Sequence, residues 1–128
     1  MKRPRNRIAT CYDHLSGIAG ERLTNRLVEL GWVTPDPDPG VTPVGWKGFA
    51  DLGLNLTPLT SSRRKPVAFC TELRGPVHHD HLGGHLGALV REHFRNMGWL
   101  TMEDGTLALT PAGEDLLQQL GVNLEAVE

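Results

Sequence analysis

The sequence is short of several features that mark common protein classes. It has only two cysteines in 128 residues, too few for a disulfide framework, so we expect a reducing, cytoplasmic setting. No stretch approaches the roughly 20 apolar residues that a membrane-spanning helix needs. The basic start MKRPRNRIATCYDH lacks the apolar region of a secretory signal. The net charge of −2 argues against a protein that coats nucleic acid through bulk positive charge, although it is compatible with a local basic patch.

The composition is that of a folded domain. Hydrophobic residues make up 39% of the chain and charged residues 22%, which suits one compact domain or two very small ones that share a core. Glycine (15) and proline (9) are both abundant. This abundance predicts many turns and short elements rather than a long helical bundle.

The chain contains an internal repeat. Residues 12–34, YDHLSGIAGERLTNRLVELGWVT, resemble residues 79–101, HDHLGGHLGALVREHFRNMGWLT, at a constant offset of 67. After one residue of slippage, residues 41–56 resemble residues 109–124 at an offset of 68. Agreement of this length with a single gap predicts two copies of one unit.

A weaker similarity links residues 8–11 to residues 67–70, with about eight extra residues inserted after Cys70. The predicted organisation is a first repeat with a basic N-terminal arm at 1–57, a polar linker at 58–66 and a second repeat at 67–128.

Each unit is predicted to consist of a helix, a β-hairpin and a second helix. In the first unit, Thr10 is the expected N-cap of the first helix, with Asp13 placed as in a capping box. Apolar residues then recur at helical spacing, and Gly31 and Gly98 are expected to end the first helix of each unit in the left-handed conformation.

The hairpin and the second helix have their own signals. The Asp104-Gly105 pair is typical of a tight hairpin turn, and the turn at 35–40 takes its place in the first unit. Thr42 and Thr110, each followed by proline, are expected to cap the second helix of each unit.

This layout is that of the back half of a winged-helix domain, with the first helix in the recognition-helix place and the hairpin as the wing. We therefore predict an α+β, helix-rich fold, a tandem repeat of two winged-helix-like units packed about a pseudo-twofold axis. Repeated glycines predict close helix approach, either between the two units or across a dimer: Gly17, Gly20, Gly84 and Gly87. The expected shared core comprises Leu15, Leu23, Leu27, Leu30, Trp32, Leu82, Leu89, Phe94, Trp99, Leu116 and Leu120.

Several motifs together resemble a known family. RIATCYDHLSGIAG, HLGGHLGALV, GWL and LTPAGEDLL are similar to the C-terminal region of bacterial ArsR-type winged-helix transcriptional regulators. The resemblance runs from about Arg7 to Leu120, and the family's N-terminal DNA-binding winged helix has no counterpart in it. It implies a component of a transcriptional regulator, an effector or dimerisation domain that forms a homodimer and contacts double-stranded DNA.

Two cysteines and two histidines occupy matching places in the repeats. Cys11 and His14 lie in the first unit, and Cys70 and His81 in the second. Thiolate and imidazole are zinc ligands, and four of them suit a tetrahedral site if the two units bring them together. The alternative is that the cysteines are small buried apolar residues and the histidines cap or pack. A second grouping, His78, His81 and His85, would share one helix face if the second-unit helix began early.

Basic residues gather in the N-terminal arm, in the linker and on the two helices in the recognition-helix place. The helices provide the candidate DNA contacts, which are Arg22, Asn25, Arg26, Arg91 and Arg95. The alternative is that these are ordinary solvated helix faces, because Glu21, Glu29 and Glu92 dilute the charge nearby.

Three functions remain open: a regulator component, a metal- or thiol-sensing module that uses the four cysteine and histidine residues, and a protein-interaction domain that does not bind DNA. The Asp-His pairs at 13–14 and 80–81 lack a nearby nucleophile and oxyanion hole, so we do not expect an enzyme.

Overall fold

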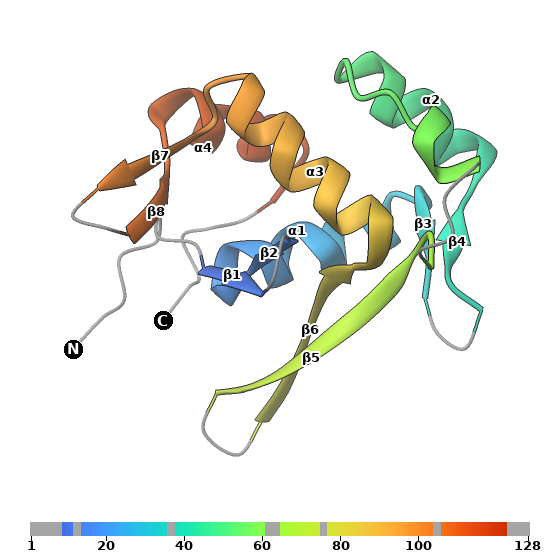
Figure 1. Ribbon diagram of the computed structural model, residues 1–128, viewed down its shortest axis with the longest axis horizontal. Coiled ribbons are helices and arrows are strands. Elements are labelled where there is room, and N and C mark those ends of the chain that lie inside the picture. The colour runs from blue at the N-terminus through green and yellow to red at the C-terminus, as the bar shows by residue number, and fades with distance from the viewer. Residues whose placement is uncertain are drawn as a thin grey trace.

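The computed structural model describes residues 9–11, 14–35, 38–60, 65–74, 77–103 and 106–122, and within these ranges it omits the side chains of 9–18, 70–81, 102, 103, 106 and 107 (Figure 1). Over the described residues the fold is α+β, with α-helices and small antiparallel hairpins, an architecture compatible with winged-helix-like units. No helix in the described part of the chain is long and apolar enough to cross a membrane.

Apart from a 3-10 helix at the end of the first half, the same order of elements occurs in the first half (residues 9–60) and in the second half (residues 65–122). The first half contains β1 (Ala9–Cys11), β2 (His14–Ser16), α1 (Gly17–Glu29), β3 (Val33–Thr34), β4 (Gly40–Val41), α2 (Pro43–Asp51) and the 3-10 helix η1 (Thr57–Thr60). The second half contains β5 (Ala68–Arg74), β6 (Val77–Gly83), α3 (Gly84–Asn96), β7 (Leu100–Glu103), β8 (Thr106–Leu109) and α4 (Pro111–Gln119). Helices α1 and α3 each have 13 residues, and α2 and α4 each have nine.

The predicted order of helix, hairpin and helix is wrong at the start of each half, because a further hairpin precedes the first helix. The segment from Thr10 onward, predicted as helical, forms the β1–β2 hairpin, and α1 begins only at Gly17. Register pairs Ala9 with Ser16 and Cys11 with His14. The expected capping at Thr10 and Asp13 therefore does not occur, because Thr10 is a strand residue and the helix starts later. Asp13 itself lies outside the described residues.

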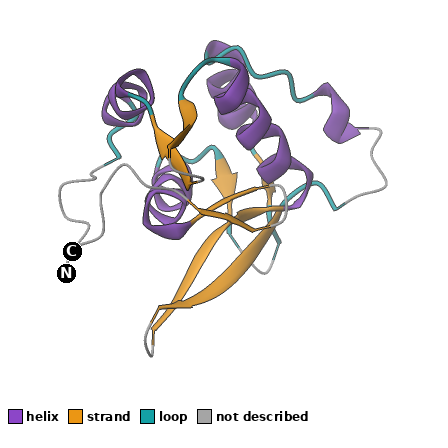
Figure 2. Cartoon of the chain, turned by 60° about the vertical axis from the view of Figure 1, so that its left-hand side comes forward, coloured by secondary structure: helices purple, strands orange, loops and turns teal. Residues whose placement is uncertain are grey.

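The insertion after Cys70 lengthens the corresponding hairpin of the second half. Strands β5 and β6 form seven register pairs, whereas β1 and β2 form three. Four additional pairs contain eight residues, which accounts for the extra length of the second repeat. In both views the far end of this hairpin extends beyond the helices (Figure 2).

The first helix of each half packs against the first hairpin of the other half. Helix α1 contacts β6 of the second half, α3 contacts β2 of the first half, and β2 lies against β6. One core results, and among the expected core residues it buries Leu23, Leu27, Leu82, Phe94 and Leu116.

The remaining expected core residues are only partly buried or have no described side chain. Four of them, Trp32, Leu89, Trp99 and Leu120, are partly buried and pack against the core. Leu30 is partly exposed and does not join it, and the side chain of Leu15 lies outside the described residues.

The predicted caps of α2 and α4 are confirmed. The Oγ1 atoms of Thr42 and Thr110 accept hydrogen bonds from the backbone N–H groups of Gly45 (2.9 Å) and Gly113 (3.1 Å). Each hydroxyl also donates to the carbonyl of the glycine that follows the preceding helix, Gly31 after α1 or Gly98 after α3. One side chain thus joins the end of one helix to the start of the next.

We predict that Thr42→Val and Thr110→Val each lower the free energy of unfolding by about 1–2 kcal/mol, because each removes an N-cap and a second hydrogen bond. Thr→Ser at the same positions retains both groups and should cost much less. Urea unfolding followed by circular dichroism measures the difference. Equal losses for valine and serine would show that the hydroxyl is not the stabilising group.

Candidate functional site

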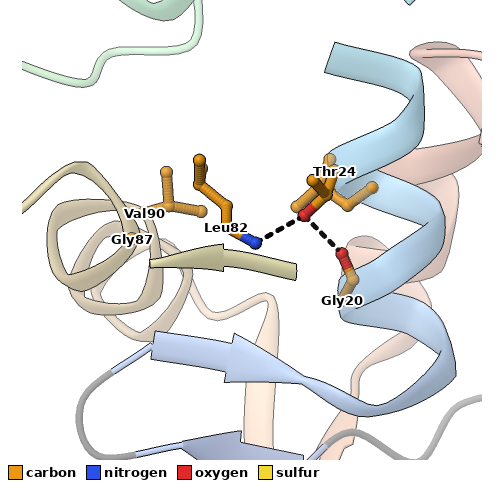
Figure 3. Close-up of a pocket in the computed structure, with 6 residues that line it drawn as sticks. Gly20, Thr24, Leu82, Gly87 and Val90 are labelled. Atoms are coloured by element: carbon orange, nitrogen blue, oxygen red, sulfur yellow. Dashed lines mark hydrogen bonds between the residues drawn. The ribbon is translucent and has the colours of Figure 1, made fainter. Parts of the chain in front are cut away.

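The two halves meet where α1 and α3 face each other across β6. Thr24 of α1 is the one buried polar residue among the described side chains, with 4% of its surface exposed. Its Oγ1 donates to the carbonyl of Gly20 (2.8 Å) and accepts from the backbone N–H of Leu82 in β6 (2.8 Å), as Figure 3 shows. This hydroxyl therefore bonds the first helix of one half to a strand of the other, away from water.

A small hollow lies at this meeting point (Figure 3). Gly20 of α1 and Gly87 of α3 both line it, together with Leu23, Leu82 and Val90. The sequence predicted close helix approach at these two glycines; both line the hollow, where α1 and α3 each pack on β6 and β2. Gly17 and Gly84, which were grouped with them, are instead the first residues of their helices.

Two further hydrogen bonds cross between the halves, and we call them the crossed caps. Nε of Arg26 in α1 donates to the carbonyl of Leu120, the C-cap residue of α4 (2.6 Å). Nε2 of His93 in α3 donates to the carbonyl of Leu52, the C-cap residue of α2 (2.8 Å). Because a carbonyl only accepts, the ring proton of His93 in this bond is on Nε2.

The crossed caps occupy matching positions of the repeat. Arg26 and His93 are 67 residues apart, and Leu52 and Leu120 are 68 apart, the two offsets found in the sequence. Both donors approach the negative end of a helix dipole, where a cation or an N–H donor is favoured. The first helix of each half therefore holds the end of the last helix of the other half.

Glycine follows each C-cap residue for a geometric reason. Gly53 and Gly121 have φ values of +87° and +88°, a conformation that side chains with a Cβ rarely adopt. A Cβ on Gly121 would also lie 2.7 Å from Nε of Arg26. The glycine therefore both ends α4 and leaves room for the guanidinium.

The residues predicted to contact DNA differ in exposure and in their partners. Asn25 and Arg95 are exposed, whereas Arg22 and Arg91 are partly buried. Arg26 is committed to the crossed cap and lies 3.5 Å from Glu29, and Arg95 lies 3.8 Å from Glu92. Their role as DNA contacts stays a prediction.

The predicted metal ligands fall in two matching hairpins. Cys11 is the register partner of His14, and Cys70 is the register partner of His81. Their side chains lie outside the described residues. Among the side chains that are described, no group of three or more His, Cys, Asp or Glu comes together.

The alternative histidine grouping is wrong. His78 and His81 lie in β6, and α3 begins only at Gly84, so they cannot share a helix face with His85. Nδ1 of His85 and Nε of Arg91 are buried with no hydrogen-bond partner among the described groups.

No sequence pattern pointed to Thr24, to His93 or to the two C-cap carbonyls as groups that join the halves. The repeat offset could have paired Arg26 with His93, since they are equivalent positions that carry hydrogen-bond donors. Thr24 gave no such signal, because its equivalent in the second half is Arg91.

Comparison with known proteins points to one class, the helix-turn-helix (HTH) type of transcriptional regulator. Over 101 residues, 78% of this chain, the sequence is 31% identical to YdfF of Bacillus subtilis (strain 168), an uncharacterised HTH-type transcriptional regulator. The chain spans 44% of the length of that relative. No family model matches the sequence, and no solved structure matches it. The similarity supports a role in transcription regulation at a coarse level.

We predict that Arg26→Met and His93→Leu each lower the free energy of unfolding by about 1–2 kcal/mol, because each leaves a C-cap carbonyl without its donor. The matched control is Arg95→Met, on the exposed side of α3, which should stay within about 0.5 kcal/mol of wild type. Urea unfolding measures all three. If Arg95→Met cost as much as Arg26→Met, the loss of a charge rather than of the crossed cap would explain the effect.

Proposed function

We propose that the chain is the effector or assembly part of a cytoplasmic transcriptional regulator, equivalent to the C-terminal region of ArsR-type proteins. In this proposal the two halves are winged-helix-like repeats related by a pseudo-twofold axis. The similarity to an HTH-type regulator supports the class, and the crossed caps at matching repeat positions support the internal symmetry. The coverage of less than half of that relative fits a chain that supplies one part of such a regulator.

The arrangement of α1 and α3 carries the proposal. In helix-turn-helix dimers the two recognition helices enter successive major grooves about 34 Å apart. Here α1 and α3 hold the recognition-helix place of each repeat, yet Gly20 and Gly87 line the same hollow. The two helices are far too close to enter successive grooves, and their apolar faces form the core. The helices therefore serve internal assembly.

Direct DNA contact is the second candidate function, favoured by the exposed side of the same helices. Asn25 and Arg95 remain accessible there, and the exposed fraction of the Arg95 side chain is 56%. Glu29 and Glu92 lie beside the basic groups and reduce the attraction for phosphate. A surface of this kind favours at most weak contact that does not read sequence.

The two candidates are separated by fluorescence anisotropy with a random-sequence duplex across a salt series. We expect the chain alone to show no binding near physiological salt, because on the described faces of α1 and α3 the exposed Arg95 lies beside Glu92 and Arg26 is held in its crossed cap. Tight binding whose affinity falls steeply with salt would favour DNA contact. In that case Arg95→Ala should weaken binding and reduce the salt slope, whereas Lys47→Ala, at an exposed position of α2, should leave it unchanged.

An assembly role also predicts a homodimer. Sedimentation velocity over a wide range of protein concentration should show a concentration-dependent shift from monomer to dimer. A single monomeric species at every concentration would contradict the homodimer and leave the pairing of the two halves as the chain's own assembly.

A further inference from the structure

The outward side of α2 is partly apolar. Its exposed residues, which we call the outer face, are Pro43, Val44, Trp46, Lys47, Ala50 and Asp51. Val44 and Trp46 have 60% and 38% of their surface exposed, and they are two of the three large hydrophobic residues exposed in the described part of the chain. The other two tryptophans, Trp32 and Trp99, pack against the core. Isolated exposed apolar residues are ordinary, but Trp46 and Ala50 lie one helical turn apart, which is typical of a contact surface.

The equivalent side of α4 is polar, although the two helices are built alike. Both begin after a threonine cap and a proline, and both bury an inner side. At the repeat offset of 68, however, the positions of Trp46 and Ala50 are taken by Glu114 and Gln118. The fold therefore does not need apolar residues at these two positions, and their presence in α2 calls for a partner.

The inner side of α2 fixes which residues point outward. Gly45 and Gly48 are buried and lie directly against Trp32. A Cβ on Gly45 would overlap the Trp32 carbonyl, and one on Gly48 would overlap the indole ring. Phe49 meets that ring edge to face, with ring centroids 5.1 Å apart. Because these contacts oppose rotation of the helix, the outer face stays turned to solvent, at the edge of the fold in Figure 1.

The charges on the outer face are self-complementary. Lys47 and Asp51 are one turn apart, with Nζ 3.2 Å from Oδ2, and their side chains are 78% and 67% exposed. A pair so exposed adds little to stability, so each group is able to take a new partner. An antiparallel copy of α2 presents the same two charges in the reverse order. Each charge then faces one of opposite sign.

We propose that two copies of this chain associate through the outer faces of α2, paired antiparallel about a two-fold axis. Such an interface uses the same patch on both subunits, so each contact is made twice. On one side of the helix pair, Trp46 packs on the small Ala50 of the partner subunit. On the other side, Lys47 meets Asp51 of the partner subunit. Helix α4 offers neither match, since its equivalent residues are polar and none of them is basic. The inference rests on the homodimer proposed above and assigns its surface.

The contact is small, so we expect a weak dimer. Helix α2 has nine residues and is about 13 Å long. Stable interfaces bury about 1,600 Å² in total, which is more than two helices of this length cover alone. The dimer should therefore dissociate on dilution.

Sedimentation velocity of the full chain and its variants tests the surface. Trp46→Glu places in α2 the residue that α4 carries at the equivalent position. It should raise the dissociation constant of the dimer by about 10-fold or more, because a buried tryptophan contributes strongly to binding at an interface. The matched control is Gln118→Glu, at the exposed equivalent of Ala50 in α4, which should leave the dissociation constant unchanged. Circular dichroism and urea unfolding of each variant show whether the monomer remains folded.

Charge reversal tests the antiparallel arrangement independently of Trp46. Lys47→Asp puts two acidic groups opposite each other and should weaken the dimer several-fold at low salt. Adding Asp51→Lys to the same chain restores opposite signs and should restore the wild-type affinity. No weakening in the single variant, or no recovery in the double variant, would overturn the antiparallel pairing.

Two outcomes separate this inference from the homodimer on which it rests. A wild-type chain that stays monomeric at every concentration would overturn both the homodimer and its surface, and would leave the outer face to a different partner. A wild-type dimer whose dissociation constant is unchanged by Trp46→Glu would overturn the surface alone.

Discussion

The whole fold depends on the first helix of each half packing against a hairpin of the other half. Helix α1 packs on β6 and α3 on β2, and the Thr24 hydroxyl accepts the N–H of Leu82 at their meeting point. Burying a hydroxyl without partners costs free energy, but here both of its hydrogen bonds are made. The crossed caps of Arg26 and His93 repeat the same exchange at the helix ends, so the two halves are joined near the strands and at their outer helices.

The packing of each first helix on the other half also bears on function. A helix that reads DNA must offer a solvent-facing surface; the apolar faces of α1 and α3 pack in the core, which leaves the side that carries Asn25 and Arg95 accessible. Arg26, which the sequence suggested as a phosphate contact, donates a hydrogen bond to the C-terminal end of α4. A basic residue on an amphipathic helix therefore has two possible targets, an external phosphate or an internal carbonyl, and only the position of the neighbouring half distinguishes them.

Much of the fold could be predicted from local signals. Thr42 and Thr110 cap their helices, Gly31, Gly53, Gly98 and Gly121 have positive φ, and the second hairpin of each half lies where the turn residues indicated. These features depend on a few neighbouring residues. The first hairpin was missed because Leu15 and Leu82 fit a helical pattern when joined to the helix that follows, although each belongs to a short strand of alternating period. The crossed caps could not be predicted, since their acceptors are backbone carbonyls, which carry no trace in the sequence. The candidate metal ligands were selected by residue type and by their matching places in the repeats, and the register of β5–β6 then placed Cys70 opposite His81 despite their long separation.

Thr24 and Arg91 stand at equivalent positions of the repeat, yet only the hydroxyl can accept a strand N–H. Two copies of the first half would place threonine at both junctions, and two copies of the second would place arginine at both. The present chain has one of each, so its halves have become complementary parts that are no longer interchangeable.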